Sequence, residues 1–168
     1  KVLALPDHET LQQFVPLYNG QPMNLSGFFH RGSDENLIVL SLADSGSGGL
    51  ETIFHEYAHL LLRRNEEFWP MWLNEGMADI YGTFEATGDH TVRVGKPQGI
   101  YLHILATQPL IPLSDLFAIT HDSPEYNERE RQGIFYAESW LLTHFLMIGN
   151  TSYRPRMAEL TMLLKRGQ

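Results

Sequence analysis

The sequence predicts an α+β domain, with short strands in the first third of the chain and helices in the rest. Strand-forming residues dominate 1–5, 26–30 and 36–43, and turn residues such as RGSDE at 31–35 separate them. From Leu50 onward, apolar residues recur at helical spacing. Strands followed by helices are typical of the α+β class.

The length and composition are those of one globular domain, because the chain has 168 residues and 43% of them are apolar. A chain of this length buries roughly 70% of the surface that its unfolded form exposes, so it needs no disulfide bonds. We therefore expect 1–168 to form a single domain. The first residue is Lys1 rather than methionine, so we expect a fragment or a processed product of a longer protein.

Composition also excludes several kinds of function. The formal net charge is −8 and there are only 3 lysines, which argues against nucleic acid or an anionic membrane as the main partner. The chain has no cysteine, which excludes a cysteine-ligated zinc and a thiol nucleophile. No apolar run approaches the roughly 18 residues that a membrane-spanning helix needs.

The central part of the chain predicts two helices. A flexible loop at 44–49 precedes a periodic segment at 50–64, which is expected to end near Asn65. Pro70 is typical of a helix start and predicts a second helix over about 70–86. The strand at 36–43 is interpreted as a core strand, or as an exposed edge that pairs with a peptide through Leu40 to Asp44.

The rest of the chain gives weaker signals. HTVRVGKP at 90–97 predicts a strand and a turn, and LSDLFAI at 113–119 predicts a short helix capped by Ser114. EYNERERQ at 125–132 is interpreted as a solvated connecting segment. Two further helices are expected at about 134–148 and 153–166.

The segment HEYAH at 55–59 has the spacing of a metal site. Residues four apart lie one above the other on a helix, so His55 and His59 can direct ring nitrogens at one ion. Glu56 then lies beside the open position, where it can take a proton from water whose pKa the ion lowers to roughly 7. Random placement gives roughly 0.03 such matches in a chain of this composition. The alternative is two half-buried histidines that bond to backbone carbonyls.

A third ligand is expected from the next helix. Glu75 follows His59 by 16 residues, and Asp79 shares its helix face, where it can fix the tautomer of a ligand imidazole. Gly76 and Gly82 permit close approach to this helix. Alternatively, Glu75 is solvated and Asp79 is a surface charge. Both lie in an apolar run, however, and a cation removes the cost of burying them.

HEYAH followed by WLNEGMAD resembles the gluzincin metallopeptidases, the thermolysin-like clan also called peptidase MA. The pattern is most similar to bacterial peptidase-MA-like domains, often found beside tetratricopeptide repeats. The resemblance covers 55–82 and 134–146. It implies a zincin-like fold, in which a small mixed or antiparallel sheet packs on the active-site helix before a mainly helical C-terminal part. It also implies one Zn²⁺ per chain, held by His55, His59 and Glu75, with Glu56 as general base and Asp79 as the partner of His55.

The segment FYAESW resembles a later helix of the clan's aminopeptidase branch and implies that Tyr136 stabilises the oxyanion. The alternatives are a core aromatic role for Tyr136 and an oxyanion role for His144. Two features depart from the clan. The interval between His59 and Glu75 is shorter than in thermolysin, and SLADSGSGGL replaces the aminopeptidase motif Gly-x-Met-Glu-Asn, which counts against recognition of a free N-terminus.

The expected function is therefore a zinc-dependent peptidase that hydrolyses a peptide or protein substrate. The alternative is a catalytically idle, zinc-containing domain of the same fold that binds a peptide or protein. We expect no nucleic acid partner and no membrane span. A flanking repeat domain is expected in the full-length protein, and an extracytoplasmic or secreted bacterial location is favoured.

Overall fold

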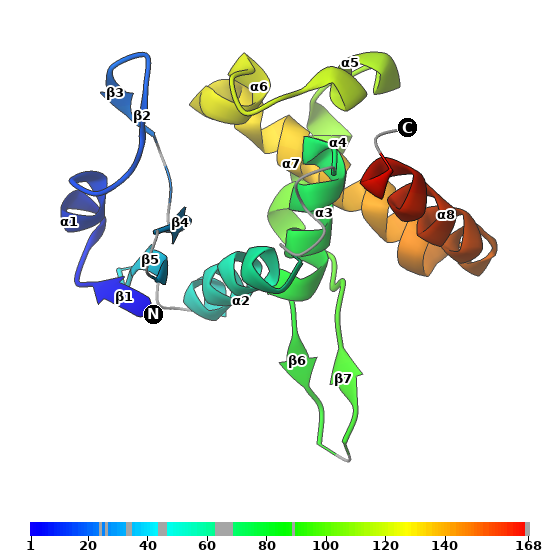
Figure 1. Cartoon of the computed structure of the whole chain (residues 1–168), viewed down its shortest axis with the longest axis horizontal. Coiled ribbons are helices and arrows are strands. Elements are labelled where there is room, and N and C mark those ends of the chain that lie inside the picture. The colour runs from blue at the N-terminus through cyan, green and yellow to red at the C-terminus, as the bar shows by residue number, and fades with distance from the viewer. Residues whose placement is uncertain are drawn as a thin grey trace.

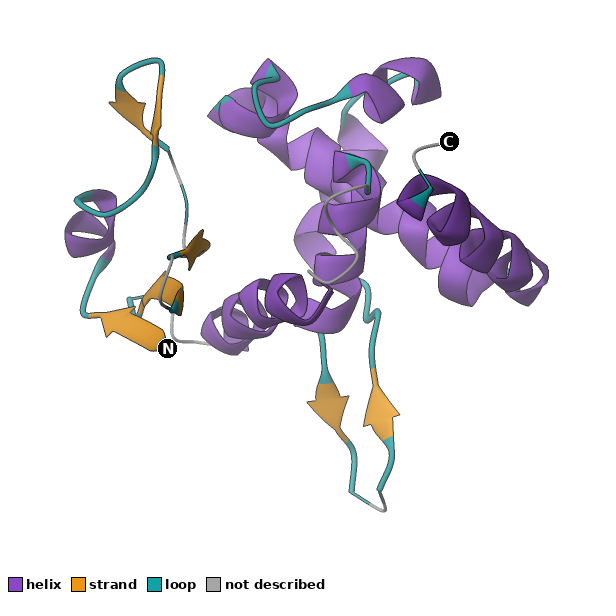
Figure 2. Cartoon of the chain, in the orientation of Figure 1, coloured by secondary structure: helices purple, strands orange, loops and turns teal. Residues whose placement is uncertain are grey.

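The computed structural model places a small β-sheet on one side of the molecule and a group of helices on the other (Figure 1 and Figure 2). It describes residues 1–23, 25, 27–32, 35–43, 47–62, 69–88 and 90–166. Strands dominate the N-terminal part and helices dominate the remainder, which confirms the predicted α+β class. A thin hairpin of β6 (Glu85–Ala86) and β7 (Val92–Arg93) projects away from the helices at the bottom of Figure 1.

The N-terminal sheet is mixed, as predicted, and has the strand order β1-β5-β4. β1 (Val2–Leu5) runs parallel to β5 (Asn36–Ser41), whereas β4 (Gly27–Arg31) runs antiparallel to it. β5 is the central strand and is buried, so its interpretation as a core strand is confirmed. The alternative, an exposed edge that binds peptide from Leu40 onward, is wrong for the described residues, and Asp44 lies outside them.

A short helix and a two-stranded hairpin between β1 and β4 lie outside the predicted set. Helix α1 (His8–Gln12) begins where the Asp7 side chain accepts a hydrogen bond of 2.7 Å from the backbone N–H of Thr10. The hairpin of β2 (Leu17–Tyr18) and β3 (Gln21–Pro22) turns at Asn19 and Gly20, which have φ values of 51° and 78°. Asn-Gly favours this turn because both residues tolerate positive φ, so the sequence does contain a signal for the hairpin.

Helix α3 (Met71–Gly82) lies between α2 (Ser47–Leu62) and α7 (Arg129–His144). Glycines let α3 approach both neighbours closely. A Cβ on Gly82 would lie 3.2 Å from the carbonyl oxygen of Glu51, and one on Gly76 would lie 2.8 Å from the carbonyl carbon of Ser139. The predicted close approach at these two glycines is therefore confirmed.

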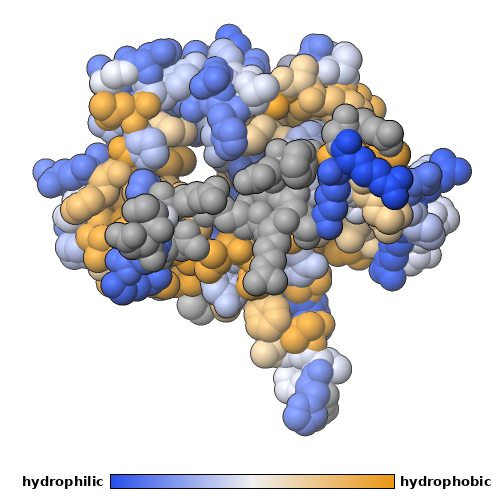
Figure 3. Space-filling view, viewed as in Figure 1, coloured by the Kyte–Doolittle hydropathy of each residue, from blue (hydrophilic) through white to orange (hydrophobic). Residues whose placement is uncertain are grey.

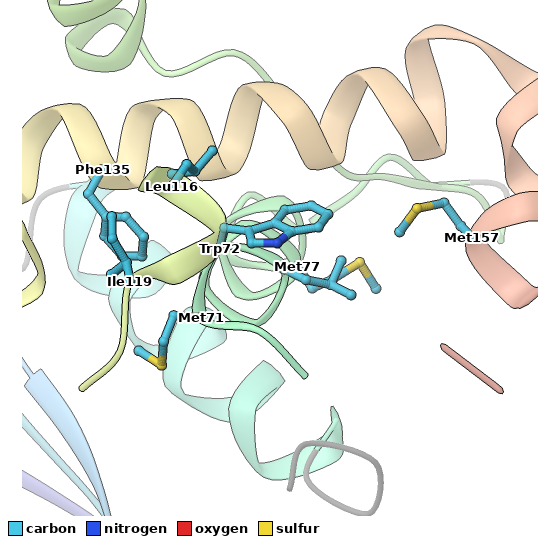
Figure 4. Close-up of a cluster of buried hydrophobic side chains, with 8 residues drawn as sticks. Met71, Trp72, Met77, Leu116, Ile119, Phe135 and Met157 are labelled. Atoms are coloured by element: carbon cyan, nitrogen blue, oxygen red, sulfur yellow. The ribbon is translucent and has the colours of Figure 1, made fainter. Parts of the chain in front are cut away.

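The main hydrophobic core surrounds α3 (Figure 4). Each large apolar side chain buried there stabilises the fold by about 1.5 to 3 kcal/mol. Helices α5 (Leu113–Ala118) and α8 (Arg154–Lys165) contribute to it together with α7. Its buried members are Met71, Trp72, Leu73, Met77, Leu116, Ile119, Phe135 and Met157. This core holds α3 in place. Helix α3 carries Glu75, the predicted metal ligand, and Asp79, the predicted partner of a ligand imidazole.

Two predicted helix boundaries are wrong. Helix α2 begins at Ser47, so the predicted loop at 44–49 is helical from residue 47, while 44–46 lie outside the described residues. The helix predicted over 70–86 ends at Gly82, because the chain turns there into the hairpin of β6 (Glu85–Ala86) and β7 (Val92–Arg93). Thr83 stabilises this turn, since its hydroxyl donates to the carbonyl of Ile80 and accepts from the backbone N–H of Lys96.

Three further expectations for the C-terminal half are corrected. The segment 125–132 is not a connection but contains α6 (Pro124–Asn127) and the first turn of α7. Ser114 does not cap α5, because the N-cap residue is Pro112 and the Ser114 hydroxyl donates to Asp115 instead. The helix expected to start at 134 starts at Arg129, and after His144 it continues as a π-helix, η2 (Phe145–Gly149). None of the described helices is long and apolar enough to cross a membrane.

Glu138 on α7 is a buried carboxyl group with one unsatisfied oxygen. Its Oε1 accepts a 2.8 Å hydrogen bond from the backbone N–H of Ile111, whereas Oε2 has no partner among the described protein groups. Burial raises the pKa of Glu138, and the bond from Ile111 lowers it in part. Since the folded protein then holds this proton more tightly than the unfolded chain, the free energy of unfolding falls as pH rises through the folded pKa.

Glu138→Gln is expected to remove this loss, because the amide keeps an acceptor for Ile111 and carries no charge. The variant's free energy of unfolding minus that of wild type should be about 1 kcal/mol larger at pH 7 than at pH 4. This is the usual scale for an unsatisfied buried polar group. Urea unfolding of both proteins at the two pH values measures the difference. Titrations elsewhere in the chain are common to both proteins and cancel. A difference that does not change with pH would contradict the prediction.

Candidate metal centre

The crossing of α2 and α3 brings three metal-ligating side chains together. The two Nε2 atoms of His55 and His59 are 3.1 Å apart, and they lie 3.4 and 3.5 Å from Oε2 of Glu75. A tetrahedral zinc ion with bonds of 2.0 to 2.1 Å separates its ligand atoms by about 3.3 Å. The three residues therefore form a group that fits a single metal ion.

Each histidine has a partner at its other ring nitrogen. Nδ1 of His55 lies 2.9 Å from Oδ1 of Asp79, and Nδ1 of His59 lies 3.2 Å from Oδ1 of Asn74. Both partners are oxygen acceptors, so they hold the ring protons at Nδ1 and leave each Nε2 lone pair for an ion. Asn74 directly precedes Glu75, so a single stretch of α3 contacts both imidazole rings.

The charges at the site also favour a cation. Glu75 is 3% and Asp79 is 4% exposed, so both carboxyl groups are buried. Burial alone would raise the pKa of Glu75, but the charges of His59 and His55 and their hydrogen bonds hold it well below its usual range. Burial would lower the pKa of His55, but hydrogen bonds to Asp79 and Glu75 raise it well above its usual value. Without a metal, the carboxylates thus favour a proton on the His55 imidazole, and a metal ion can replace that positive charge.

Glu56 lies beside this group and lines the same cleft. Its side chain is largely buried, and burial raises its pKa, while the positive charges of His55 and His59 lower it in part. Because it follows His55 directly on α2, it points away from the ligand face by about a third of a turn. It is therefore available to water or substrate without being one of the three grouped ligands.

The site opens into a cleft of about 860 Å³ between the N-terminal elements and the helices. Figure 3 shows the molecule hollowed between these two parts. One wall comes from β2 and β4, and the other from α6 and α7, with α2 and α3 between them. The hydroxyl of Tyr18 donates to the carbonyl oxygen of Asp122 at 3.4 Å, which joins the two walls. A cleft of this size has room for several residues of an extended peptide.

Tyr136 lines the cleft as well, and a second tyrosine accompanies it. The rings of Tyr136 and Tyr126 have centroids 6.3 Å apart, and the Tyr126 hydroxyl interacts with both the Tyr136 hydroxyl and the Glu75 carboxylate. Burial, followed by the charge of Glu75, raises the pKa of both phenols, so both remain hydrogen-bond donors at neutral pH. Tyr136 also packs against Phe135, with ring centroids 5.4 Å apart, so the core aromatic packing considered for it is observed.

His144 does not reach the cleft in the part of the chain that the structure describes. Its ring stacks on Trp140, with centroids 5.0 Å apart, and it lies close to Gly95. Gly95 has a φ of 73°, which a residue with a side chain rarely adopts. The proposed oxyanion role of His144 is therefore not supported, and the residue is a packed helix residue.

Three residues near the candidate ligands were outside the predicted set: Asn74, Tyr126 and Tyr101. The Tyr101 hydroxyl donates to Oδ2 of Asp79 at 2.9 Å. No family model matches the chain, and no curated protein or solved structure is significantly similar to it.

Proposed function

We propose that the protein is a zinc-dependent peptidase of the gluzincin type. The observation that supports this most is the triangle of His55 Nε2, His59 Nε2 and Glu75 Oε2, with Glu56 beside it in the cleft. Two imidazoles and one carboxylate are one of the usual sets of protein ligands for a catalytic zinc, which keeps a fourth position for water or substrate. Calcium and magnesium prefer oxygen ligands alone, so this set favours zinc.

The chain's own residues then divide the work of hydrolysis. An ion held by His55, His59 and Glu75 would supply Lewis acidity and would lower the pKa of a nearby water to roughly 7. Glu56 would take a proton from the water that attacks the peptide carbonyl, and would return it to the leaving amine. Tyr136 donates a hydrogen bond to the negative charge that develops on the carbonyl oxygen. Tyr126 contacts both Tyr136 and Glu75, so it orients the first and holds the second.

Zinc titration of the metal-free protein tests the proposal. We expect about one zinc ion per chain, and a 1,000-fold excess over the dissociation constant should raise the free energy of unfolding by about 4 kcal/mol. Glu75→Gln should weaken zinc binding strongly, because it removes the only charged ligand of the three. Calorimetry and thermal unfolding with and without a chelator measure both effects.

Glu51→Gln is the matched control, because Glu51 lies on α2 one turn before His55 and outside the ligand group. It should bind zinc as wild type does. A wild-type protein whose stability is insensitive to both zinc and chelator would contradict the proposal.

A further inference from the structure

Tyr101 connects a surface helix to the candidate metal centre. It lies on α4 (Gly99–Thr107), and its hydroxyl donates to Oδ2 of Asp79 at 2.9 Å. The Tyr101 ring rests against Trp140 of α7, with centroids 6.2 Å apart. Ile100 and Leu102, its neighbours, are 60% and 51% exposed, so α4 is otherwise a surface element.

The two oxygens of Asp79 have different partners. Oδ1 faces Nδ1 of His55 and Oδ2 faces the hydroxyl of Tyr101, each at 2.9 Å. A carboxylate only accepts, so the phenol and the imidazole N–H must both donate to it. The terminal torsion of an aspartate is broad, and one hydrogen bond alone leaves the carboxylate free to rock about it. A second donor at the opposite oxygen removes this freedom.

We propose that Tyr101 is a positioning residue of the metal centre, which holds Asp79 in the orientation that fixes the ring of His55. This inference rests on the metal site of the proposed function. It makes α4 part of the centre, in addition to α2 and α3. It also implies a linkage: if docking of α4 favours metal binding at His55, metal binding must favour docking of α4 to the same degree.

The linkage has a chemical reason. A metal ion on Nε2 of His55 increases the acidity of the Nδ1 proton and strengthens its bond to Asp79. The hydrogen bond from Tyr101 limits how far the Asp79 carboxylate can move toward His55. A fixed Tyr101 therefore keeps the imidazole aligned with the ion. Tyr101→Phe removes the hydroxyl but keeps the ring against Trp140, which separates positioning from packing.

The test measures zinc affinity by competition with a chromophoric chelator in four proteins: wild type, Tyr101→Phe, Asp79→Asn and the double variant. We expect Tyr101→Phe to weaken zinc binding by about 10-fold and Asp79→Asn by up to about 100-fold, the range found for partners of ligand imidazoles. In the Asp79→Asn background, Tyr101→Phe should cause no further loss. Tyr153→Phe is the matched control, because Tyr153 packs on Phe145 near the C-terminal helix and should bind zinc normally.

A second measurement follows the amide hydrogen exchange of 99–107. Zinc should slow this exchange in wild type and have little effect on it in Tyr101→Phe. Should Tyr101→Phe not fold, Asp79→Asn provides the same test, since its α4 amides should also lose their response to zinc.

Two results would overturn the inference: wild-type zinc affinity in Tyr101→Phe, or an equal loss of affinity in the Asp79→Asn background. The second would mean that the Tyr101 hydroxyl acts independently of Asp79. A wild-type protein that binds no zinc would instead refute the proposed function, so the two failures are distinguishable.

Discussion

Glutamine in place of Glu56 is expected to leave zinc binding intact and to lower the rate of peptide hydrolysis by about 10²- to 10⁴-fold. Glu56 lies in the cleft beside the ligand group but is not part of it. Glutamine has nearly the same shape, so the packing of α2 is preserved. It cannot accept a proton from water, and the step that generates the nucleophile loses its base.

A peptide library supplies the substrate, and the rate is measured with and without chelator after zinc loading has been verified. Glu51→Gln on the same helix should retain full activity. A Glu56→Gln protein as active as wild type would remove Glu56 from the mechanism. Saturable peptide binding without cleavage by the wild type would instead identify the catalytically idle, zinc-containing binding domain.

The ligand group is the part of the site that the sequence describes best, and the reason is local geometry. His55 and His59 share a helix face because they are four residues apart, and the same spacing relates Glu75 to Asp79. Helix formation alone therefore orders each pair. Local geometry does not determine how α2 and α3 cross. The glycines at 76 and 82 nevertheless indicated that α3 is approached closely by its neighbours.

Residues that reach the site from other elements had no comparable signal. Tyr101 is 22 residues from Asp79. Helix α4 has apolar residues on all sides, so no contrast between a polar and an apolar face indicated which side of the helix packs on the protein. Tyr126 stands within EYNERERQ, where charged neighbours suggested solvent exposure. Such positions depend on how α6 and α4 pack on α7, and tertiary packing is not encoded in local periodicity. Asn74 is different, because its place beside Glu75 in WLNEG gave a usable hint.

Alanine in place of Gly76 is expected to destabilise the fold by about 3 kcal/mol or more and to weaken zinc binding. A Cβ at this position would collide with Thr143 Oγ1 and with the backbone carbonyl oxygen of Ser139. Overpacking of a core usually costs about 1 to 3 kcal/mol, and more where the obstacle is backbone that cannot rotate away. Because Gly76 follows Glu75 directly, any shift of α3 away from α7 also moves a candidate metal ligand.

Urea unfolding of the metal-free proteins and zinc titration measure the two effects separately. Gly99→Ala is the matched control: a Cβ there meets nothing within 4 Å, so the helical position should tolerate alanine with equal or slightly higher stability. Thr143→Ala should not rescue Gly76→Ala, since it removes the hydroxyl but leaves the Ser139 carbonyl in place. Rescue by Thr143→Ala would show that the side chain sets the distance between α3 and α7. Failure of rescue would show that the two backbones set it, and with it the position of Glu75.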